Sequence, residues 1–200
     1  MKLFDSAASP YVRKINVLLH ELGKSDEIER EPVATTAFNS AEALIAANPL
    51  GKIPALTLND GRVLYDSRVI SAYLNAHFDG PFRPDDGFQT LLLEATGDGI
   101  MDCTVSMAYE VRLRPEGERS AKWIEAQWAK ASRAIKALNS DFIEQLNSPI
   151  TVGHISVGCA LGYVDFRHDA RGWRDTAPEL ADWFADFSSR PSMQLTQPKG

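Results

Sequence analysis

The sequence predicts an α/β domain built on a mixed β-sheet, followed by an all-α domain. Residues 1–78 alternate short apolar runs with helical patterns, residues 79–86 are rich in Pro, Gly and Asp, and residues 87–200 show helical spacing. We therefore expect an α/β domain at 1–78, a linker at 79–86 and a helical domain at 87–200. With 200 residues, of which 44% are hydrophobic, the chain is long enough for two such domains with buried cores.

The first domain is expected to alternate strands and helices. Pro10 suits the first position of a helix whose apolar residues share one face. Asp60-Gly61 between two apolar runs indicates a hairpin, and Asp66-Ser67 opens another helical pattern. The expected elements are strand 2–5, helix 10–22, strand 28–33, helix 40–47, strands 55–58 and 63–65, and a helix after Asp66. This order, βαβ followed by ββα, is the thioredoxin-like arrangement, a mixed sheet with helices on both faces.

The second domain is predicted from two helical patterns. Apolar residues recur at spacings of three and four from Ile124 to Leu146, which is typical of a buried helix face. The segment 155–166 is apolar around most of its circumference, and its glycines and alanine let neighbouring elements approach closely. We expect this segment to be the buried central helix of the domain.

The charge of the chain argues against nucleic acid and membrane partners. Its formal net charge is −6, whereas nucleic acids and anionic membranes favour clustered Lys and Arg. The local basic run of Arg112, Arg114 and Arg119 is interrupted by glutamates and is interpreted as a solvated face. The apolar run after Lys2 is too short for a signal peptide, and no stretch reaches membrane-spanning length. A soluble, cytoplasmic protein is therefore expected.

Cysteine and histidine usage indicates neither a redox motif nor a metal site. Cys103 and Cys159 lack Cys-x-x-Cys spacing and are expected to be small core residues in a reducing compartment. The histidines fall on different expected elements, without a pair at metal-ligand spacing. No metal is therefore expected.

Ser9 is the first candidate site residue, because it stands at the start of the helix expected at 10–22. Free N–H groups and the positive end of the helix macrodipole favour an anion there, and a bound thiolate is such an anion. Lowering the pKa of a thiol from about 8.5 by about two units needs about 2.7 kcal/mol. A charge-assisted hydrogen bond from a hydroxyl, roughly 1.5–3 kcal/mol, and a helix terminus, roughly 0.3–1 kcal/mol, supply about this much. The competing interpretation is that Ser9 only caps the helix.

The Ile53-Pro54 bond stands between a turn and a short apolar strand. A cis bond at this place bends the chain and exposes a strand edge. The N–H and C=O of Ile53 can then pair with an extended, peptide-like ligand, as in strand addition. The alternative is an ordinary trans proline in a loop.

Asp66-Ser67 follows the second strand of the expected hairpin and begins a helix. Ser67 can offer its N–H and hydroxyl to a ligand carboxylate, while Asp66 can accept from a ligand ammonium group. Simple N-capping explains this pair equally well when it is taken alone.

In their order and spacing, these motifs resemble those of glutathione S-transferases over essentially the whole chain. The matching segments are Ser9-Pro10-Tyr11-Val12-Arg13-Lys14, residues 48–54, Asp66-Ser67 and residues 158–167, the last resembling the central helix of bacterial members. The resemblance implies the glutathione transferase fold, glutathione as co-substrate, a homodimer, and Ser9 as the residue that activates the thiol. The glutathione-binding residues that it implies are Ser9, Tyr11, Lys52, Ile53 beside a cis-Pro54, Asp66 and Ser67.

A small electrophile or a peroxide is then expected as the second substrate, and its identity cannot be read from the residues. The resemblance implies that it approaches from the helical domain. The residues expected around it are Tyr11, Met101, Asp102, Val105 and Tyr109.

The sequence departs from the family pattern at the start of the central helix. Family members often have Ser or Thr followed three residues later by Asp, a reciprocal capping box, whereas here Thr151 is followed by His154. His154 cannot act as the acidic partner, so we expect only the Thr151 half of the box to remain.

Two other functions stay open at this point. The first is a non-catalytic, glutathione-transferase-like scaffold that binds another protein, since a fold alone does not fix activity. A glutathione-dependent disulfide reductase is the second, although a hydroxyl at Ser9 cannot form the mixed disulfide that family members with cysteine there tend to form.

Overall fold

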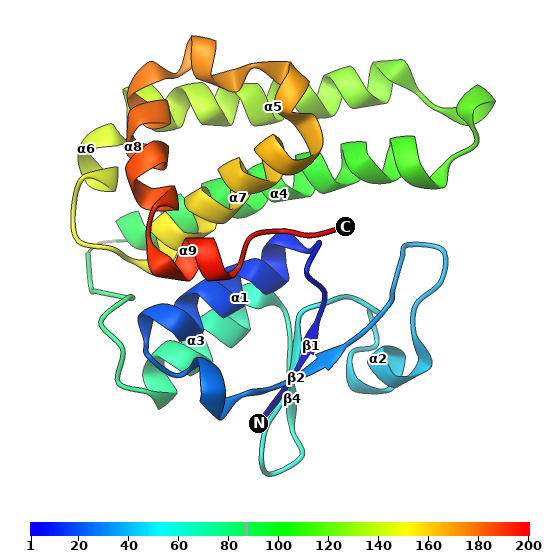
Figure 1. The fold of residues 1–200 in the computed structure, drawn as a ribbon, viewed down its shortest axis with the longest axis vertical. Helices are drawn as coiled ribbons and strands as arrows, with labels where there is room; N and C mark the ends of the chain where they lie inside the picture. The colour runs from blue at the N-terminus through cyan, green and yellow to red at the C-terminus, as the bar shows by residue number, and fades with distance from the viewer. Residues whose placement is uncertain (87) are drawn as a thin grey trace. The chain divides into compact units, whose positions relative to one another are not determined.

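The computed structural model describes residues 1–86 and 88–200. The chain forms two compact units. The first unit combines Met1–Pro84 with Pro191–Gly200, and the second is Asp85–Arg190 (Figure 1). The first contains a mixed four-stranded sheet and the second is helical, which confirms the predicted fold class.

The sheet of the first unit has the strand order β2-β1-β3-β4. Its strands are β1 (Lys2–Asp5), β2 (Glu29–Pro32), β3 (Ala55–Thr57) and β4 (Val63–Leu64). β1 pairs with β2 in parallel, and β3 is antiparallel to both β1 and β4. The register pairs Phe4 with Ala55 and Leu56 with Leu64.

Alternating side chains of the strands fill two cores, one on each face of the sheet. The helices of this unit are α1 (Pro10–Glu21), α2 (Glu42–Ala47), α3 (Ser67–His77) and α9 (Pro191–Leu195), with a 3-10 turn at Ser25–Glu27. On one face, Phe4 and Ala55 pack against Leu44 of α2. Leu3 and Leu56 alternate with Phe4 and Ala55 along the strands, so they point to the other face, and both are fully buried. In Figure 1, α1 and α3 lie on the opposite side of the sheet from α2. Helices therefore cover both faces, as predicted.

The second unit is built around a long helix pair. Its helices are α4 (Gln89–Leu113), α5 (Ala121–Ser140), α6 (Ile143–Leu146), α7 (Val152–His168) and α8 (Pro178–Ser188), with 3-10 turns at Glu116–Glu118, Asp169–Arg171 and Trp173–Thr176. α7 packs along α4 and is buried over almost its whole length, as expected for 155–166. The stripe from Ile124 to Leu146 is divided between α5 and α6, because the chain leaves the helix at Asp141.

The close approach of α4 and α7 depends on a glycine. A Cβ placed on Gly97 of α4 would lie 2.5 Å from the Ser156 hydroxyl oxygen and 2.7 Å from the backbone carbonyl carbon of Ser156. The Ser156 hydroxyl itself donates to the carbonyl of Glu94 at 3.2 Å and to the carboxylate of Asp98 at 2.7 Å. Close backbone packing and buried hydrogen bonds therefore join α4 and α7 at the same place, around Gly97 and Ser156.

The C-terminal segment returns to the first unit. The Arg13 guanidinium donates to the carbonyl of Met193 at 3.1 Å, and the Lys199 N–H donates to the carbonyl of Ala7 at 3.2 Å. By contact, residues 191–200 group with the first unit rather than with the helical domain, which was predicted to span 87–200. The reason is that α9 packs on α1.

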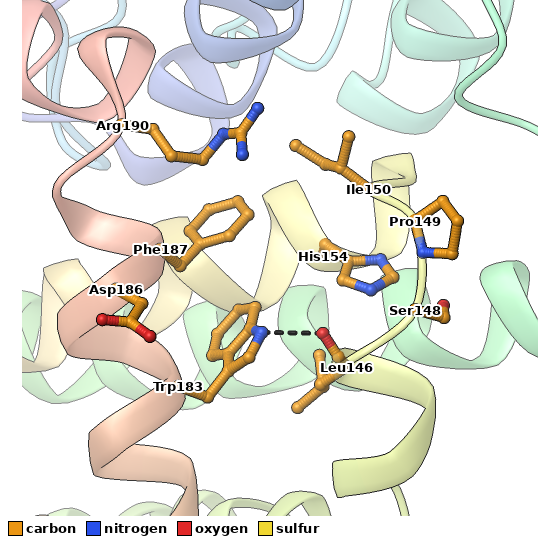
Figure 2. Close-up of a pocket in the computed structure, with 9 residues that line it drawn as sticks. All are labelled: Leu146, Ser148, Pro149, Ile150, His154, Trp183, Asp186, Phe187 and Arg190. Carbon is orange, nitrogen blue, oxygen red and sulfur yellow. Dashed lines mark hydrogen bonds between the residues drawn. The ribbon is translucent and has the colours of Figure 1, made fainter.

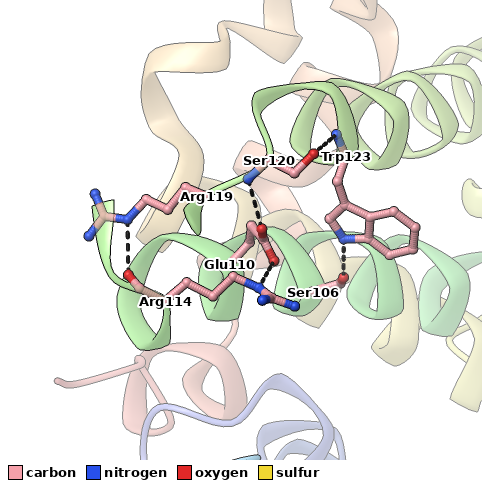
Figure 3. A network of polar contacts seen from close by, with 6 residues as sticks. All are labelled: Ser106, Glu110, Arg114, Arg119, Ser120 and Trp123. Carbon is pink, nitrogen blue, oxygen red and sulfur yellow. Dashed lines mark hydrogen bonds and ion pairs between the residues drawn. The ribbon is translucent and has the colours of Figure 1, made fainter. Parts of the chain in front are cut away.

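A polar network joins the end of α4 to the start of α5 (Figure 3). The buried Glu110 carboxylate accepts from the Ser120 N–H at 2.9 Å and from the Arg114 guanidinium at 2.8 Å. The Arg119 side chain donates to the Arg114 carbonyl at 3.2 Å, and the Trp123 indole donates to the Ser106 hydroxyl at 3.1 Å. Two arginines of the basic run are therefore engaged in fixing this connection.

Neither cysteine forms a disulfide, and Cys159 is buried while Cys103 is half-buried. Burial raises the pKa of the Cys103 thiol, so its thiolate is disfavoured at neutral pH. Within residues 1–86 and 88–200, none of the helices has the length and apolar character needed to cross a membrane.

The start of α7 corrects the expectation for His154. The Thr151 N–H donates to Nδ1 of His154 at 3.1 Å, and the Thr151 hydroxyl accepts from the Gly153 N–H at 3.2 Å, so both halves of a capping box are present. Because Nδ1 accepts, Nε2 carries the hydrogen and donates to the Gln145 carbonyl at 3.1 Å. The expectation of a half box was wrong because a neutral imidazole nitrogen accepts a hydrogen bond as a carboxylate oxygen does.

This capping box predicts that acid destabilises the helical unit. Burial, the largest influence, lowers the pKa of His154, and a protonated Nδ1 can no longer accept from Thr151. The contribution is therefore complete above the unfolded pKa of about 6.5 and is lost as the pH falls through the folded pKa. We expect urea unfolding, followed by tryptophan fluorescence, to show lower stability at about pH 5.5 than at about pH 7.5.

The matched variant for this prediction is His154→Gln, because glutamine is a natural partner in capping boxes and does not titrate. It should reduce the pH dependence of stability without removing it, since burial also lowers the pKa of His168. An unchanged pH dependence in His154→Gln would show that His154 does not titrate on unfolding.

Candidate functional site

The sheet topology brings the three predicted site segments to one end of the sheet. Ser9 follows the last residue of β1 by a short turn, and Ile53-Pro54 immediately precedes β3. Since β1 and β3 are antiparallel, the end of β1 lies beside the start of β3, where Phe4 pairs with Ala55. β4 is antiparallel to β3, so Asp66, which follows it, lies at the same end.

Ser9 is the N-cap of α1. Its backbone is extended, with φ −87° and ψ 121°, and its hydroxyl oxygen accepts from the Val12 N–H at 3.3 Å. A serine hydroxyl has one donor hydrogen besides its acceptor lone pairs. Capping uses only the oxygen, so the hydroxyl hydrogen remains for an anion, and the two interpretations of Ser9 are compatible.

The turn before Ile53 is organised by a buried asparagine that the predicted site did not include. Asn48 is 2% exposed; its side-chain NH₂ donates to the Lys52 carbonyl at 2.7 Å, and its Oδ1 accepts from the Leu50 N–H at 3.0 Å. Gly51 has φ +61°, and a Cβ there would lie 2.7 Å from the Ser40 hydroxyl oxygen, so glycine is required. A signal was present in the sequence, since Asn commonly bonds to the backbone two residues on in turns.

The Ile53–Pro54 peptide bond is cis, as the resemblance implies. Pro54 is buried and Ile53 is half-buried, whereas Lys52 is exposed. Among the described residues, neither the N–H nor the C=O of Ile53 forms a hydrogen bond. Ile53 therefore presents an unused donor and an unused acceptor side by side on the backbone.

Asp66 is the N-cap of α3, and its Oδ1 accepts from the Arg68 N–H at 3.0 Å. Its side chain is exposed, while Ser67 is 3% exposed. Within the part of the chain that the structure describes, the second carboxylate oxygen of Asp66 has no partner. The Tyr65–Asp66 peptide bond is also cis. As at Ser9, capping leaves part of the side chain available.

The residues predicted around the second substrate are spread over α1 and one helix of the second unit. Tyr11 is half-buried on α1. On α4, Met101 is fully buried, Val105 is half-buried, and Asp102 and Tyr109 are exposed. Their role in a second-substrate pocket stays a prediction.

The helical unit contains a cavity of about 370 Å³ that sequence reasoning did not anticipate (Figure 2). It lies between α8 and the segment joining α6 to α7. The Trp183 indole donates to the Leu146 carbonyl at 2.8 Å, and the Trp183 and Phe187 rings stack with centroids 4.8 Å apart. His154 also lines the cavity, with both ring nitrogens already hydrogen-bonded. None of the predicted site residues lines it.

Two family models match the chain. The model of the glutathione S-transferase N-terminal domain matches residues 8–77, and the model of the C-terminal domain matches residues 121–186. The first match spans Ser9, Ile53 and Asp66.

Similar proteins match over nearly their whole length. The uncharacterized GST-like protein YibF of Escherichia coli (strain K12) is 31% identical over 204 residues, which cover 99% of this chain and 98% of that protein. A crystal structure of a glutathione transferase family member from Pseudomonas fluorescens Pf-5 with bound glutathione is 44% identical, with a TM-score of 0.97 over 100% of this chain and 99% of that one. A glutathione S-transferase from Methylobacillus flagellatus KT with GSH bound is 34% identical, with a TM-score of 0.85 over 99% of each chain.

Proposed function

The chain belongs to the glutathione S-transferase family, and we propose that it binds glutathione at the end of the sheet that carries Ser9, Ile53 and Asp66. The observation that carries this proposal is the free N–H and C=O of Ile53, placed next to two helix caps with unused polar atoms. Strand addition of a short peptide uses such a backbone pair.

Each part of glutathione has a counterpart among these residues. The Ile53 backbone pairs with the cysteinyl residue of the ligand. Asp66 accepts from the ammonium group of the γ-glutamyl moiety, and Ser67 donates to its carboxylate. Lys52, an exposed cation next to Ile53, interacts with the glycyl carboxylate, and Tyr11 lies beside the sulfur.

Ser9 donates its hydroxyl hydrogen to the sulfur and stabilises the thiolate. The Val12 N–H occupies one lone pair of the hydroxyl oxygen and holds the side chain at the start of α1. The hydrogen bond to the thiolate contributes roughly 1.5–3 kcal/mol and the helix terminus roughly 0.3–1 kcal/mol. Together they lower the thiol pKa by about two units, and the proton is released to solvent.

Glutathione supplies the nucleophilic sulfur of the reaction. Its thiolate forms a bond to an electrophilic carbon, whose leaving group departs with the bonding electrons. With a peroxide, the thiolate forms a bond to one oxygen, the O–O bond breaks, and the other oxygen leaves as hydroxide or alkoxide and is protonated by solvent. The resulting glutathione sulfenic acid then reacts with a second glutathione thiol to give glutathione disulfide and water. This chain's own residues bind the peptide and keep the sulfur deprotonated. We further propose a cytoplasmic homodimer, in line with the family resemblance, which sedimentation and cell fractionation measure directly.

Asp66→Asn tests the binding site with little effect on folding. Asparagine caps helices as well as aspartate does but lacks the charge that attracts an ammonium group. We expect the dissociation constant for glutathione, measured by calorimetry, to rise about tenfold.

The matched control is Asp60→Asn, which removes an exposed carboxylate from the hairpin of the same unit. It should leave glutathione affinity unchanged. Equal weakening by both variants would indicate a general charge effect, and the absence of saturable glutathione binding to the unmodified protein would refute the proposed function.

A further inference from the structure

The first unit also contains a cavity, which is separate from the glutathione site proposed above. We propose that this cavity binds a small phosphate dianion, either inorganic phosphate or a phosphate monoester; the inference does not depend on the proposed function. The cavity has a volume of about 230 Å³ and lies between α1, β2 and the C-terminal segment. Arg13 and Asn16 of α1, Arg30 of β2, and Thr196 and Lys199 of the C-terminal segment contribute to its lining.

Arg13 provides a buried positive charge without a counterion. Arg13 is only 8% exposed. Its guanidinium donates to two neutral oxygens, the Met193 carbonyl at 3.1 Å and the Thr196 hydroxyl at 3.5 Å. Among residues 1–86 and 88–200, no carboxylate forms an ion pair with it. A guanidinium stays charged at any physiological pH, and burying it unpaired is unfavourable. A bound anion would supply the missing charge.

Arg30 provides a second charge that is only weakly compensated. Its Nε donates to the side-chain oxygen of Asn16 at 2.9 Å, and an Nη donates to the Ile28 carbonyl at 2.5 Å. The Asp5 carboxylate oxygen lies 3.9 Å from Nε, beyond hydrogen-bond distance. Burial lowers the pKa of Arg30, so desolvation outweighs the attraction of Asp5.

The charge around the cavity is opposite in sign to that of the chain. Of the described residues that line the cavity, Arg13, Arg30 and Lys199 are cationic and Asp5 alone carries a carboxylate. The whole chain, in contrast, has a formal net charge of −6. In the described residues Lys199 forms no ion pair. A local excess of cations in an acidic protein concentrates anions at that place.

The shape of the donors favours a tetrahedral oxyanion. Guanidinium groups bind phosphate through paired, parallel hydrogen bonds, and two of them converge here from different elements. A water molecule takes a share of about 30 Å³ in the liquid, so the cavity accommodates several waters or one phosphate with a small substituent.

The C-terminal segment forms one wall, so the anion and this segment are expected to stabilise each other. Met193 and Thr196 contact Arg13 directly, and the backbone of Lys199 bonds to Ala7. Occupancy of the cavity would therefore hold the segment on α1.

The test is a calorimetric titration of the full chain with inorganic phosphate at constant ionic strength, with glutathione present at saturation to occupy the other proposed site. We expect saturable binding that Arg30→Gln and Lys199→Ala each weaken about tenfold. Neither change removes a hydrogen bond that holds the C-terminal segment, because Arg30 bonds to Asn16 and Lys199 bonds to Ala7 through its backbone. Hydrogen exchange of residues 191–200 should slow when phosphate is added.

Lys122→Ala is the matched control, since it removes an exposed lysine from α5 in the other unit. Unchanged affinity in this variant supports the site. Equal weakening by all three variants, or no saturable phosphate binding, would overturn it. A parallel titration with glycerol phosphate distinguishes inorganic phosphate from a phosphate monoester as the ligand. If glycerol phosphate binds more tightly than inorganic phosphate, the cavity is assigned to monoesters; if it binds more weakly, the cavity is assigned to inorganic phosphate.

Discussion

Ser9→Ala is expected to raise the thiol pKa of bound glutathione by about one to two units and to lower kcat/KM about 10–100-fold. The reason is the loss of the hydroxyl hydrogen that stabilises the thiolate, while the Ile53 edge and the Asp66 cap remain. The ultraviolet absorbance of the thiolate, titrated against pH in the presence of bound glutathione, measures the pKa. Steady-state kinetics with a model electrophile measure kcat/KM.

Because Ser9 also caps α1, the effect of Ser9→Ala on the stability of the protein must be separated from its effect on the thiol pKa of bound glutathione. Alanine at an N-cap costs about 1 kcal/mol. Ser120→Ala removes the corresponding cap of α5, whose hydroxyl accepts from the Trp123 N–H at 3.2 Å, and should cost similar stability without shifting the thiol pKa. Ser9→Asp retains a good cap but cannot donate and repels a thiolate, so the thiol pKa should rise further. A normal thiolate signal in Ser9→Asp would exclude the proposed role of the hydroxyl.

Gly97→Ala is expected to destabilise the helical unit by about 2–4 kcal/mol. The new Cβ would meet backbone atoms of Ser156 and Val157 at 2.7 and 2.8 Å, which cannot rotate away as a side chain can. α4 and α7 would have to separate, which strains the buried hydrogen bonds from Ser156 to Glu94 and Asp98. Denaturant unfolding followed by tryptophan fluorescence reports this unit selectively. All four tryptophans, Trp123, Trp128, Trp173 and Trp183, lie within it.

Gly99→Ala supplies the matched control on the same helix. No described atom lies within 4 Å of a Cβ placed there. Alanine is the better helix former, so this change should stabilise the unit by about 0.4–1 kcal/mol. If Gly97→Ala and Gly99→Ala had similar free energies of unfolding, the close contact between α4 and α7 at Gly97 would be contradicted.

The features that were predictable from the sequence are those with a local cause. Pro10 after Ser9 indicates a capped helix, and the structure has the Ser9 hydroxyl bonded to Val12 as a cap requires. The hairpin turn was signalled by Asp60-Gly61, although only Gly61 has a positive φ, of 86°. The buried helix followed from its uninterrupted apolar composition, and it begins three residues earlier than the segment 155–166.

The features that were missed depend on geometry that spacing does not reveal. The role of Asn48 required knowing that its side chain turns inward and reaches Lys52. The capping by His154 depended on which imidazole nitrogen carries the hydrogen, which the Gln145 carbonyl decides. The position of α9 on α1 depends on contacts of Arg13 with residues about 180 positions away, and helical periodicity carries no information about such partners.

The return of the C-terminal segment to α1 has a consequence for how the protein is made. A ribosome releases the β-sheet and α1–α3 first, then the whole of Asp85–Arg190, and only afterwards the segment that covers Arg13. In a nascent chain, one flank of α1 therefore stays uncovered until residues 191–200 have emerged. A prematurely terminated chain would lack this cover even when every residue of the glutathione site is present.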